Sequence, residues 1–192
     1  MKDFNVRDKV AQAAVELFAE KGYANTSVQE VVTRAGVTKG AMYHYYRSKD
    51  DLLFDIYERM LTLQRDHLDE IIARGLPTHE TLRAACIDVV ETSIDALREG
   101  TVFFRSAHML SPDRQQEVTR RRREYNDAFA SIVRQGQSEG LYRGDIPLAV
   151  LVANFFSDLH YLSHWYKPTG AESKTQVAEQ ITDLFLKGIA AT

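Results

Sequence analysis

Residues 26–54 (TSVQEVVTRAGVTKGAMYHYYRSKDDLLF) constrain the fold more than any other stretch of this 192-residue chain. They predict two short helices joined by a tight turn at residues 35–37 (AGV), followed by the capped start of a longer helix. Gly36 suits that turn because glycine takes a positive φ without a steric penalty. Thr38 can cap the second helix, whose free N–H groups could then face DNA phosphates. The segment therefore predicts a helix-turn-helix.

The spacing of the second helix sorts its residues into an inner and an outer face. Met42 and Tyr46 are four residues apart and apolar enough to face the core of a small domain, with Val37 at the turn beside them. Two further pairs with the same spacing share the outer face. This outer face carries Lys39, Gly40, Tyr43 and His44. We expect a DNA duplex to lie against it.

The charge of the chain is unevenly distributed. Residues 1–49 hold eight basic and five acidic residues, whereas residues 50–192 hold sixteen basic and twenty-two acidic ones. Between Thr33 and Lys49 there are four basic residues and no Asp or Glu, although the net charge of the whole chain is −3. A local positive excess is what contact with phosphates requires, so the helix-turn-helix is the expected DNA-binding part.

Eight residues in this region are candidate DNA contacts. They are Thr26, Ser27, Thr38, Lys39, Gly40, Tyr43, His44 and Lys49. Thr26 or Ser27 also caps the helix before the turn, and Glu30 completes a capping box with Ser27. Lys49 opposes the dipole of the helix that it begins, which favours a functional reason for a lysine there. The alternatives are that Tyr43 only packs, that Lys49 is an ordinary surface lysine and that His44 is a partly buried ring.

The pattern of spaced residues resembles the DNA-binding domain of TetR-family transcriptional regulators. The matching segments are residues 18–23 (FAEKGY), 26–31 (TSVQEV), 35–46 (AGVTKGAMYHYY) and 48–52 (SKDDL). They cover roughly the first quarter of the chain and agree at many positions at once. Tyr46 is a mild departure, because the family usually has Phe there. The resemblance implies a transcriptional regulator, and we expect it to repress transcription.

The composition predicts an all-α fold. Hydrophobic spacing is helical almost throughout, and only four prolines occur. We expect about nine helices, at residues 6–21, 27–34, 38–45, 49–73, 78–98, 101–110, 113–139, 147–166 and 173–189. Residues 1–48 form the expected helix-turn-helix domain, and residues 49–192 the expected ligand-binding and dimerisation domain. The single Cys86, the charged N-terminus and the lack of a long apolar run favour a cytoplasmic protein with no membrane contact.

The last two expected helices are the most apolar part of the chain. Residues 148–166 (LAVLVANFFSDLHYLSHWY) are hydrophobic on more than one face, which is typical of a helix in a core or a subunit contact. Two such helices from each of two chains would make a four-helix interface. The candidate interface residues are Phe156, Val177, Ile181, Leu184 and Phe185. The TetR resemblance implies a homodimer that pairs through these helices and binds double-stranded, palindromic operator DNA.

The C-terminal part is similar to a TetR subgroup that responds to CoA thioesters from fatty-acid or steroid-ring breakdown. The similarity rests on residues 120–125 (RRRREY), Phe129, Gly136, residues 140–147 (GLYRGDIP) and residues 164–170 (HWYKPTG). It implies a small hydrophobic effector, with aromatic residues around its acyl part and arginines, Arg114 among them, near its phosphates. The candidate ligand residues are Phe103, Phe104, Arg121, Arg122, Tyr125, Phe129, Phe155, Leu159 and Trp165. The alternatives are solvated arginines, ordinary core phenylalanines, and a Trp165 in the dimer contact.

Two other functions remain open from the sequence. One is a multidrug-type sensor of a neutral or cationic hydrophobic compound. The other is an all-α metal-dependent enzyme, because His160 and His164 lie four apart and would form half of a metal site on one helix. No spacing fixes a third or fourth ligand, and no catalytic or nucleotide-binding motif occurs. We therefore expect neither an enzyme, nor a metal site, nor a cofactor.

Overall fold

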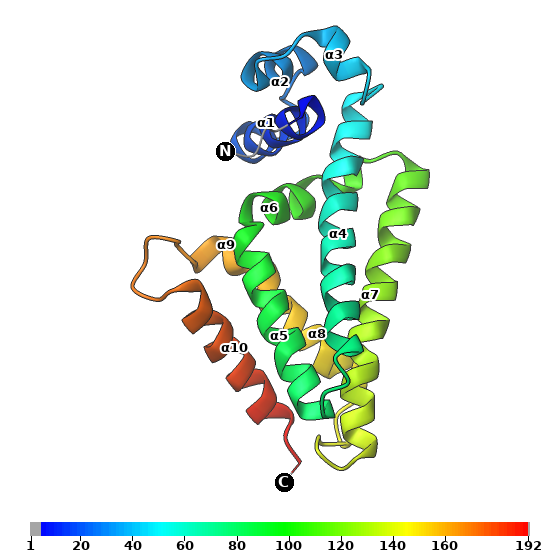
Figure 1. The fold of residues 1–192 in the computed structure, drawn as a ribbon, viewed down its shortest axis with the longest axis vertical. Coiled ribbons are helices and arrows are strands. Elements are labelled where there is room, and N and C mark those ends of the chain that lie inside the picture. Colours follow the sequence, from blue (N-terminus) through cyan, green and yellow to red (C-terminus); the bar gives the residue numbers. More distant parts are fainter. Residues whose placement is uncertain (1–4, 192) are drawn as a thin grey trace. The chain divides into compact units, whose positions relative to one another are not determined.

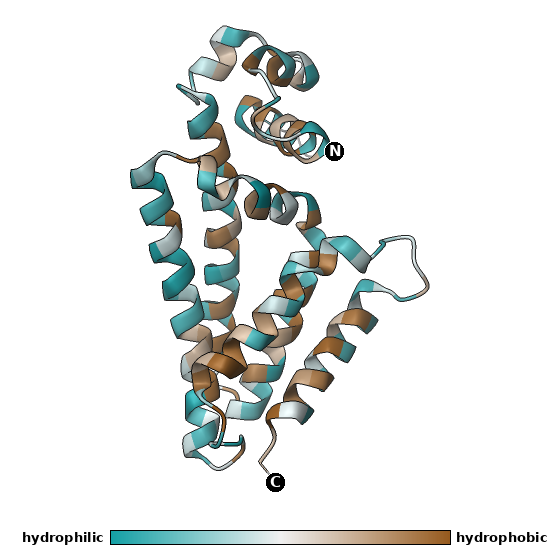
Figure 2. Cartoon of the chain, turned by 180° about the vertical axis from the view of Figure 1, so that it is seen from behind, coloured by the Kyte–Doolittle hydropathy of each residue, from teal (hydrophilic) through white to brown (hydrophobic). Residues whose placement is uncertain are grey.

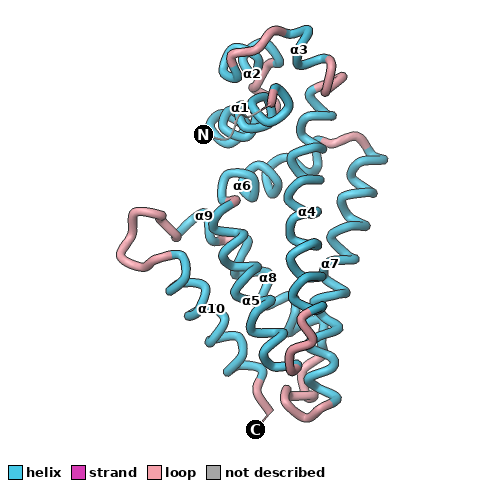
Figure 3. Tube along the Cα trace, viewed as in Figure 1, coloured by secondary structure: helices cyan, strands magenta, loops and turns pink. Residues whose placement is uncertain are grey.

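The computed structural model describes residues 5–191, and their structure confirms the all-α fold class. The helices are α1 (Val6–Lys21), α2 (Val28–Ala35), α3 (Lys39–Tyr43), α4 (Lys49–Ala73), α5 (Thr78–Asp95), α6 (Leu97–Ser106), a 3-10 helix η1 (Ala107–Met109), α7 (Pro112–Ser138), α8 (Leu148–His160), α9 (Leu162–Trp165) and α10 (Lys174–Ile189). Helices and loops account for the described part of the chain in Figure 3, and the one β-bridge among these residues joins Tyr142 to Ala190. No described helix has the length and apolar character that crossing a bilayer requires.

Several helix boundaries differ from the expected ones. The expected helix 147–166 is divided at Tyr161 into α8 and α9, so the described residues contain ten α-helices instead of about nine. Neither Gly nor Pro marks that division. The fifth helix ends at Asp95 and the sixth starts at Leu97, so that Gly100 lies inside α6 instead of before it. The second helix of the helix-turn-helix, expected at residues 38–45, is shorter and ends at Tyr43.

The chain divides into two compact units. The first contains residues up to Met60 together with Arg98–Thr119, and the second contains Leu61–Leu97 together with Arg120–Thr192. Helices α4 and α7 each begin in the first unit and end in the second. These units are defined by packing and not by function. The expected boundary between a DNA-binding domain, residues 1–48, and a ligand-binding and dimerisation domain, residues 49–192, stays a prediction.

In the first unit, α1, α2 and α3 pack together around apolar side chains (Figure 1). Phe18 of α1, Val31 of α2 and Met42 of α3 are almost completely buried. The rings of Phe18 and Tyr23 meet edge to face, with their centroids 5.2 Å apart. Burial of these side chains is what holds three short helices together, because helices of eight and five residues are marginal in water by themselves.

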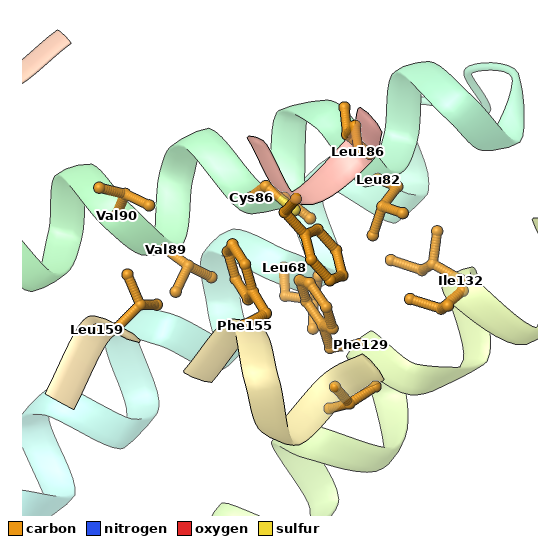
Figure 4. Packing of buried hydrophobic residues seen from close by; sticks show 14 of the residues in the cluster. Leu68, Leu82, Cys86, Val89, Val90, Phe129, Ile132, Phe155, Leu159 and Leu186 are labelled. Atoms are coloured by element: carbon orange, nitrogen blue, oxygen red, sulfur yellow. The ribbon is translucent and has the colours of Figure 1, made fainter. Parts of the chain in front are cut away.

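The second unit has its own hydrophobic core, shown in Figure 4. Phe129 of α7 and Phe155 of α8 stack with their ring centroids 5.3 Å apart and their planes nearly parallel. Phe185 of α10 lies 4.7 Å from Phe155, and α10 packs along α5. The core is therefore assembled from α5, α7, α8 and α10, with Leu68 contributed by α4.

Gly136 allows the end of α7 to meet the loop that follows it. A Cβ atom on Gly136 would lie 2.2 Å from two ring carbons of Tyr142, whose side chain is buried. Contacts that close do not occur, so a side chain at this position must displace the ring. The glycine is thus required by packing and not by backbone conformation.

We predict that Gly136→Ala lowers the stability of the protein by about 1–3 kcal/mol, the usual cost of overpacking. In a chain of this length the melting temperature should fall by roughly 2–4 °C per kcal/mol. Gly100→Ala is the matched control, because Gly100 lies inside α6 and a Cβ atom there meets nothing within 4 Å. The control should keep or raise the melting temperature, and equal losses in both variants would contradict the packing argument.

Candidate nucleic-acid interface and effector region

The caps of the helix-turn-helix have the geometry that the sequence predicts. The Ser27 hydroxyl accepts a hydrogen bond from the Glu30 N–H, and the Glu30 carboxylate accepts one from the Ser27 N–H at 2.8 Å. Bonds from Lys21 and Ser27 lower the pKa of Glu30 to about 2. Gly36 adopts a left-handed conformation with φ of 66°, and the Thr38 hydroxyl accepts from the Ala41 N–H at 3.1 Å. The turn and both N-caps are confirmed.

We call α3 the recognition helix. The inner and outer faces of α3 and of the turn that follows it are separated as predicted. Met42 and Tyr46 are 0% and 3% exposed. The opposite side forms what we call the reading surface. It consists of the exposed residues Thr38, Lys39, Gly40, Tyr43 and His44. Lys39 has no ion-pair partner among the described residues, so its ammonium is available to a phosphate.

Tyr45 is an exposed aromatic residue that the sequence analysis did not single out. Its ring meets that of His44 edge to face at 5.0 Å, and 47% of the residue is exposed. The expected helix continues through residue 45, and the spacing assigns its outer face to residues 39, 40, 43 and 44, so Tyr45 is not placed there. Because α3 ends at Tyr43, Tyr45 lies in the turn that follows and adds a second large ring to the exposed side.

Thr26 and Lys49 have partners within the chain. Thr26 is 2% exposed, and its hydroxyl donates to the Gly22 carbonyl at 2.9 Å. The Lys49 ammonium donates to the carbonyl oxygens of Tyr23 and Thr26 at 2.7 and 2.9 Å and lies 4.2 Å from the Tyr23 ring centroid. Burial lowers the pKa of Lys49. These contacts close the loop between α1 and α2 and favour a structural role, so a phosphate contact stays a prediction for both residues.

A buried carboxylate on α4 connects the turn after α3 to α1. Asp55 of α4 is 8% exposed and accepts a hydrogen bond from the Tyr46 hydroxyl at 2.7 Å. It also pairs with Arg7 of α1 at 2.5 Å and with Arg59 of α4 at 2.8 Å. Burial and the bond to Asp55 raise the pKa of Tyr46 to about 12. Sequence reasoning missed this network. The partners Arg7 and Tyr46 lie outside α4, and spacing within one helix does not indicate such partners.

The first turn of α4 is fixed by a second set of charges. The Asp51 carboxylate accepts from the N–H groups of Arg47 and Ser48 at 2.7 and 3.1 Å, and the Asp51 N–H donates to the Ser48 hydroxyl, so the start of α4 is capped as expected. Arg114 of α7 pairs with Asp51 and, at 3.0 Å, with Asp50. These ion pairs favour a structural role for Arg114, so the expected contact with the effector's phosphates stays a prediction.

The candidate ligand residues fall into both units. In the first unit, Phe103 is buried with its ring 4.6 Å from that of Tyr57, whereas Phe104 is 47% exposed. In the second unit, four candidates are part of the hydrophobic core and Trp165 is 51% exposed. The four are Tyr125, Phe129, Phe155 and Leu159. Arg121 donates to the Thr62 hydroxyl at 3.0 Å, and Arg122 is half-buried.

The candidate dimer residues are divided between the protomer's own core and its surface. Val177 and Phe185 are 3% and 8% exposed within the single chain, so they pack against their own core. Phe156 and Ile181 are partly buried, and Leu184 is 74% exposed. The buried arc of α10 includes Ala178, Leu186 and Ile189 as well, and is displaced from the stripe that the sequence suggested.

The division of α8 from α9 separates the two histidines proposed as a metal half-site. His160 ends α8 and is half-buried, and both burial and the charge of Arg122 lower its pKa. His164 lies in α9, is exposed and stacks on the Tyr161 ring at 4.6 Å. The described residues contain no group of three or more His, Cys, Asp or Glu arranged to hold a metal ion. The continuous helix on which the half-site depended is absent.

A helix-turn-helix with an exposed basic surface, followed by a larger helical part, defines a DNA-binding regulator. Comparison with known families agrees. Residues 11–56 match the model for bacterial regulatory proteins of the tetR family, and residues 75–189 match the model for the tetracyclin repressor-like C-terminal domain. The chain therefore belongs to the TetR family. It is a transcriptional regulator that binds operator DNA and carries a C-terminal ligand-binding domain.

Similar proteins cover nearly the whole chain. The HTH-type transcriptional repressor KstR2 of Rhodococcus jostii is 27% identical over 188 residues, which is 96% of this chain and 91% of the relative. The structure of the ketosteroid transcriptional regulator KstR2 of Mycobacterium tuberculosis has a TM-score of 0.86 at 22% identity, covering 98% of this chain and 96% of that one. The structure of AibR with isovaleryl coenzyme A and operator DNA has a TM-score of 0.77 at 22% identity, covering 97% and 98%. At these identities the two structures share the fold.

We predict that Lys39→Ala and Tyr43→Ala each weaken operator binding while helical content stays unchanged, because both side chains are exposed on the reading surface. Lys39→Ala should also reduce the slope of log affinity against log salt by about one, as expected for one lost phosphate contact. Gel-shift titrations at several salt concentrations measure both effects. Arg134→Ala, which removes an exposed charge from the second half of α7, is the control and should change neither. Wild-type binding by both reading-surface variants would contradict the assignment.

Proposed function

We propose that this protein represses transcription from a palindromic operator and is released from it by a hydrophobic CoA thioester. The observation that carries the DNA-binding part is the reading surface, where Lys39, Tyr43 and His44 are exposed in a stretch without acidic residues. Regulators of this family bind operator DNA as dimers. Two half-sites then act together, which raises the affinity that one short helix can reach alone. Such a protein would work in the cytoplasm, where bacterial DNA is.

The effector class is proposed from chemistry and from two relatives. AibR has been solved with isovaleryl coenzyme A, and KstR2 is described as a ketosteroid regulator. In this chain the half-buried Arg122 lies three residues before the core residue Tyr125 on α7, in the second unit. A ligand with an apolar body and a charged head would match that combination of groups.

Helices α8 and α10 carry exposed apolar residues that support a dimer contact. Apolar stretches along both helices are visible in Figure 2. Val150 is 54% exposed and Leu184 is 74% exposed, and Tyr161 follows α8 at 65%. Exposed apolar side chains of this kind are typical of a surface that a second copy covers. A dimer of this kind would hold its two recognition helices about 34–36 Å apart, one turn of DNA.

Release requires the effector to prefer a conformation that does not bind DNA. Moving a two-state equilibrium from one extreme to the other needs about 5.5 kcal/mol of differential binding. Apolar burial of an acyl group and charge pairing of the CoA phosphates could supply this together. Either half alone should be a weak effector.

We predict that Leu184→Glu converts the dimer to a monomer and abolishes operator binding together with dimerisation. A carboxylate facing its symmetry mate is costly to desolvate and repels the other copy. Light scattering reports the mass and gel shift the DNA binding. Leu63→Glu is the control, because Leu63 is also exposed, at 46%, but lies on α4. A dimer that survives Leu184→Glu would place the interface elsewhere.

We predict that a CoA thioester of a hydrophobic acid raises the melting temperature and releases DNA, whereas free CoA and the free acid act weakly. Thermal shift and gel shift with the same three compounds test this. The alternative is a multidrug-type sensor, and one observation favours it. Arg120 pairs with Glu124 and Arg121 bonds to Thr62, so both have partners within the protein. If a neutral drug-like compound releases DNA and no thioester does, that alternative is the correct one.

A further inference from the structure

We propose that the buried Tyr125 hydroxyl donates a hydrogen bond to an oxygen acceptor of the effector, with Arg122 one turn before it on α7 and His160 on the neighbouring α8. We call these three residues the polar layer. The inference rests on the proposed function in assuming a hydrophobic effector, and it adds that this effector carries a carbonyl or carboxylate oxygen at this point. It also makes Tyr125 a residue that selects among effectors.

The Tyr125 hydroxyl is a buried donor without a partner. Tyr125 is 5% exposed, and its hydroxyl has no hydrogen-bond partner among the described residues. Burial raises the pKa of Tyr125, so the hydroxyl keeps its proton and remains a donor. Buried polar groups in folded proteins are nearly always hydrogen-bonded, and one that is not points to a missing partner. The nearby Asp88 is already paired with His67 at 2.9 Å.

Contacts between α7 and α8 place Arg122 and His160 about one helical turn from Tyr125 and Phe156 along the two helices. Arg122 and Tyr125 are three residues apart on α7, and therefore share a face of that helix. On α8, Phe156 and His160 are four apart and share a face too. The ring of Tyr125 lies 6.0 Å from that of Phe156, and the charge of Arg122 acts on His160. Along the two helices, Tyr125 thus faces Phe156, and Arg122 faces His160 one turn further on.

The next pair along the same helices is apolar. Phe129 lies 5.1 Å from Phe156 and stacks on Phe155 at 5.3 Å. Polarity therefore changes over two turns of α7, from an aromatic cluster at Phe129 to a basic group at Arg122. An apolar body with an oxygen-bearing group at one end matches that order.

The charge of the polar layer selects for an acceptor. Arg122 is half-buried, and this burial lowers the pKa of its guanidinium. An oxygen with negative or partial negative charge would be stabilised there. A ligand that has only hydrocarbon at this point would pack against the Tyr125 hydroxyl without accepting its hydrogen bond. Sites with a buried polar group reject such analogues strongly for that reason.

The test compares wild type with Tyr125→Phe, which keeps the ring and removes the hydroxyl. The probes are octanoyl-CoA, its thioether analogue S-octyl-CoA, which lacks the carbonyl, and 7-oxooctanoyl-CoA, which adds a ketone to the tail. Calorimetry measures their dissociation constants. Tyr125→Phe should weaken the acceptor-bearing probes about tenfold, the value of one hydrogen bond. Loss with both carbonyl probes identifies the thioester oxygen, and loss with 7-oxooctanoyl-CoA alone identifies an oxygen on the acyl tail.

Two control variants make the result specific. Tyr142→Phe removes another buried tyrosine hydroxyl, which lies 3.5 Å from the His79 ring nitrogen, and should leave all three affinities unchanged. Arg122→Gln should weaken the acceptor-bearing probes, whereas Arg123→Gln, at an exposed position of the same helix, should not. Equal affinity of wild type and Tyr125→Phe for every probe that binds would overturn the inference.

A measurement without ligand separates this inference from the proposed function. An unpartnered hydroxyl contributes no hydrogen bond to the free protein, so Tyr125→Phe should melt at or above the wild-type temperature. A melting temperature several degrees below wild type would mean that the hydroxyl has a partner already, and would overturn the inference. If wild type binds none of the three probes, the CoA part of the proposed function fails, and the melting comparison alone decides the inference.

Discussion

The buried carboxylate of Asp55 is the interaction on which the DNA-reading part depends. A charge removed from water is tolerated only when hydrogen bonds and opposite charges surround it, and Asp55 has Tyr46, Arg7 and Arg59 for this purpose. These partners come from α1, from the turn after α3 and from α4 itself. Loss of any one would leave the carboxylate undercompensated. The orientation of α3, and of the reading surface that it carries, relative to α1 and the start of α4 is therefore held by electrostatics as well as by apolar packing.

A second charged cluster brings a later part of the chain into the same unit. Arg114 of α7 pairs with Asp50 and Asp51 at the start of α4, and the Tyr57 hydroxyl donates to carbonyl oxygens of α6. Residues 98–119 thus contact the first half of α4 and belong to the same compact unit as the helix-turn-helix, although they are distant from it in the sequence. Only part of the chain beyond residue 48 forms a core of its own. That core, in the second unit, contains the aromatic cluster and Tyr125.

Features set by neighbouring residues were predictable from the sequence, and features set by distant partners were not. The caps at Ser27 and Thr38 and the inward faces of Met42 and Tyr46 follow from local spacing, and the structure has them. The roles of Lys49 and Arg114 could not be predicted, because their partners are residues 23 and 26 in one case and residues 50 and 51 in the other. The division at Tyr161 has no Gly or Pro signal. The arc of α10 that faces its own core depends on how α10 meets α5, which spacing within α10 does not fix.

The central claim is that this chain reads a palindromic DNA sequence as a homodimer, and selection from a random pool of duplex DNA tests it most directly. The account predicts enrichment of one inverted repeat, whose half-sites are about one helical turn or a multiple of it apart. A Lys39→Ala/Tyr43→Ala double variant run in parallel should enrich nothing comparable. Enrichment of a single unrepeated half-site, or the same sequences from both proteins, would contradict the account.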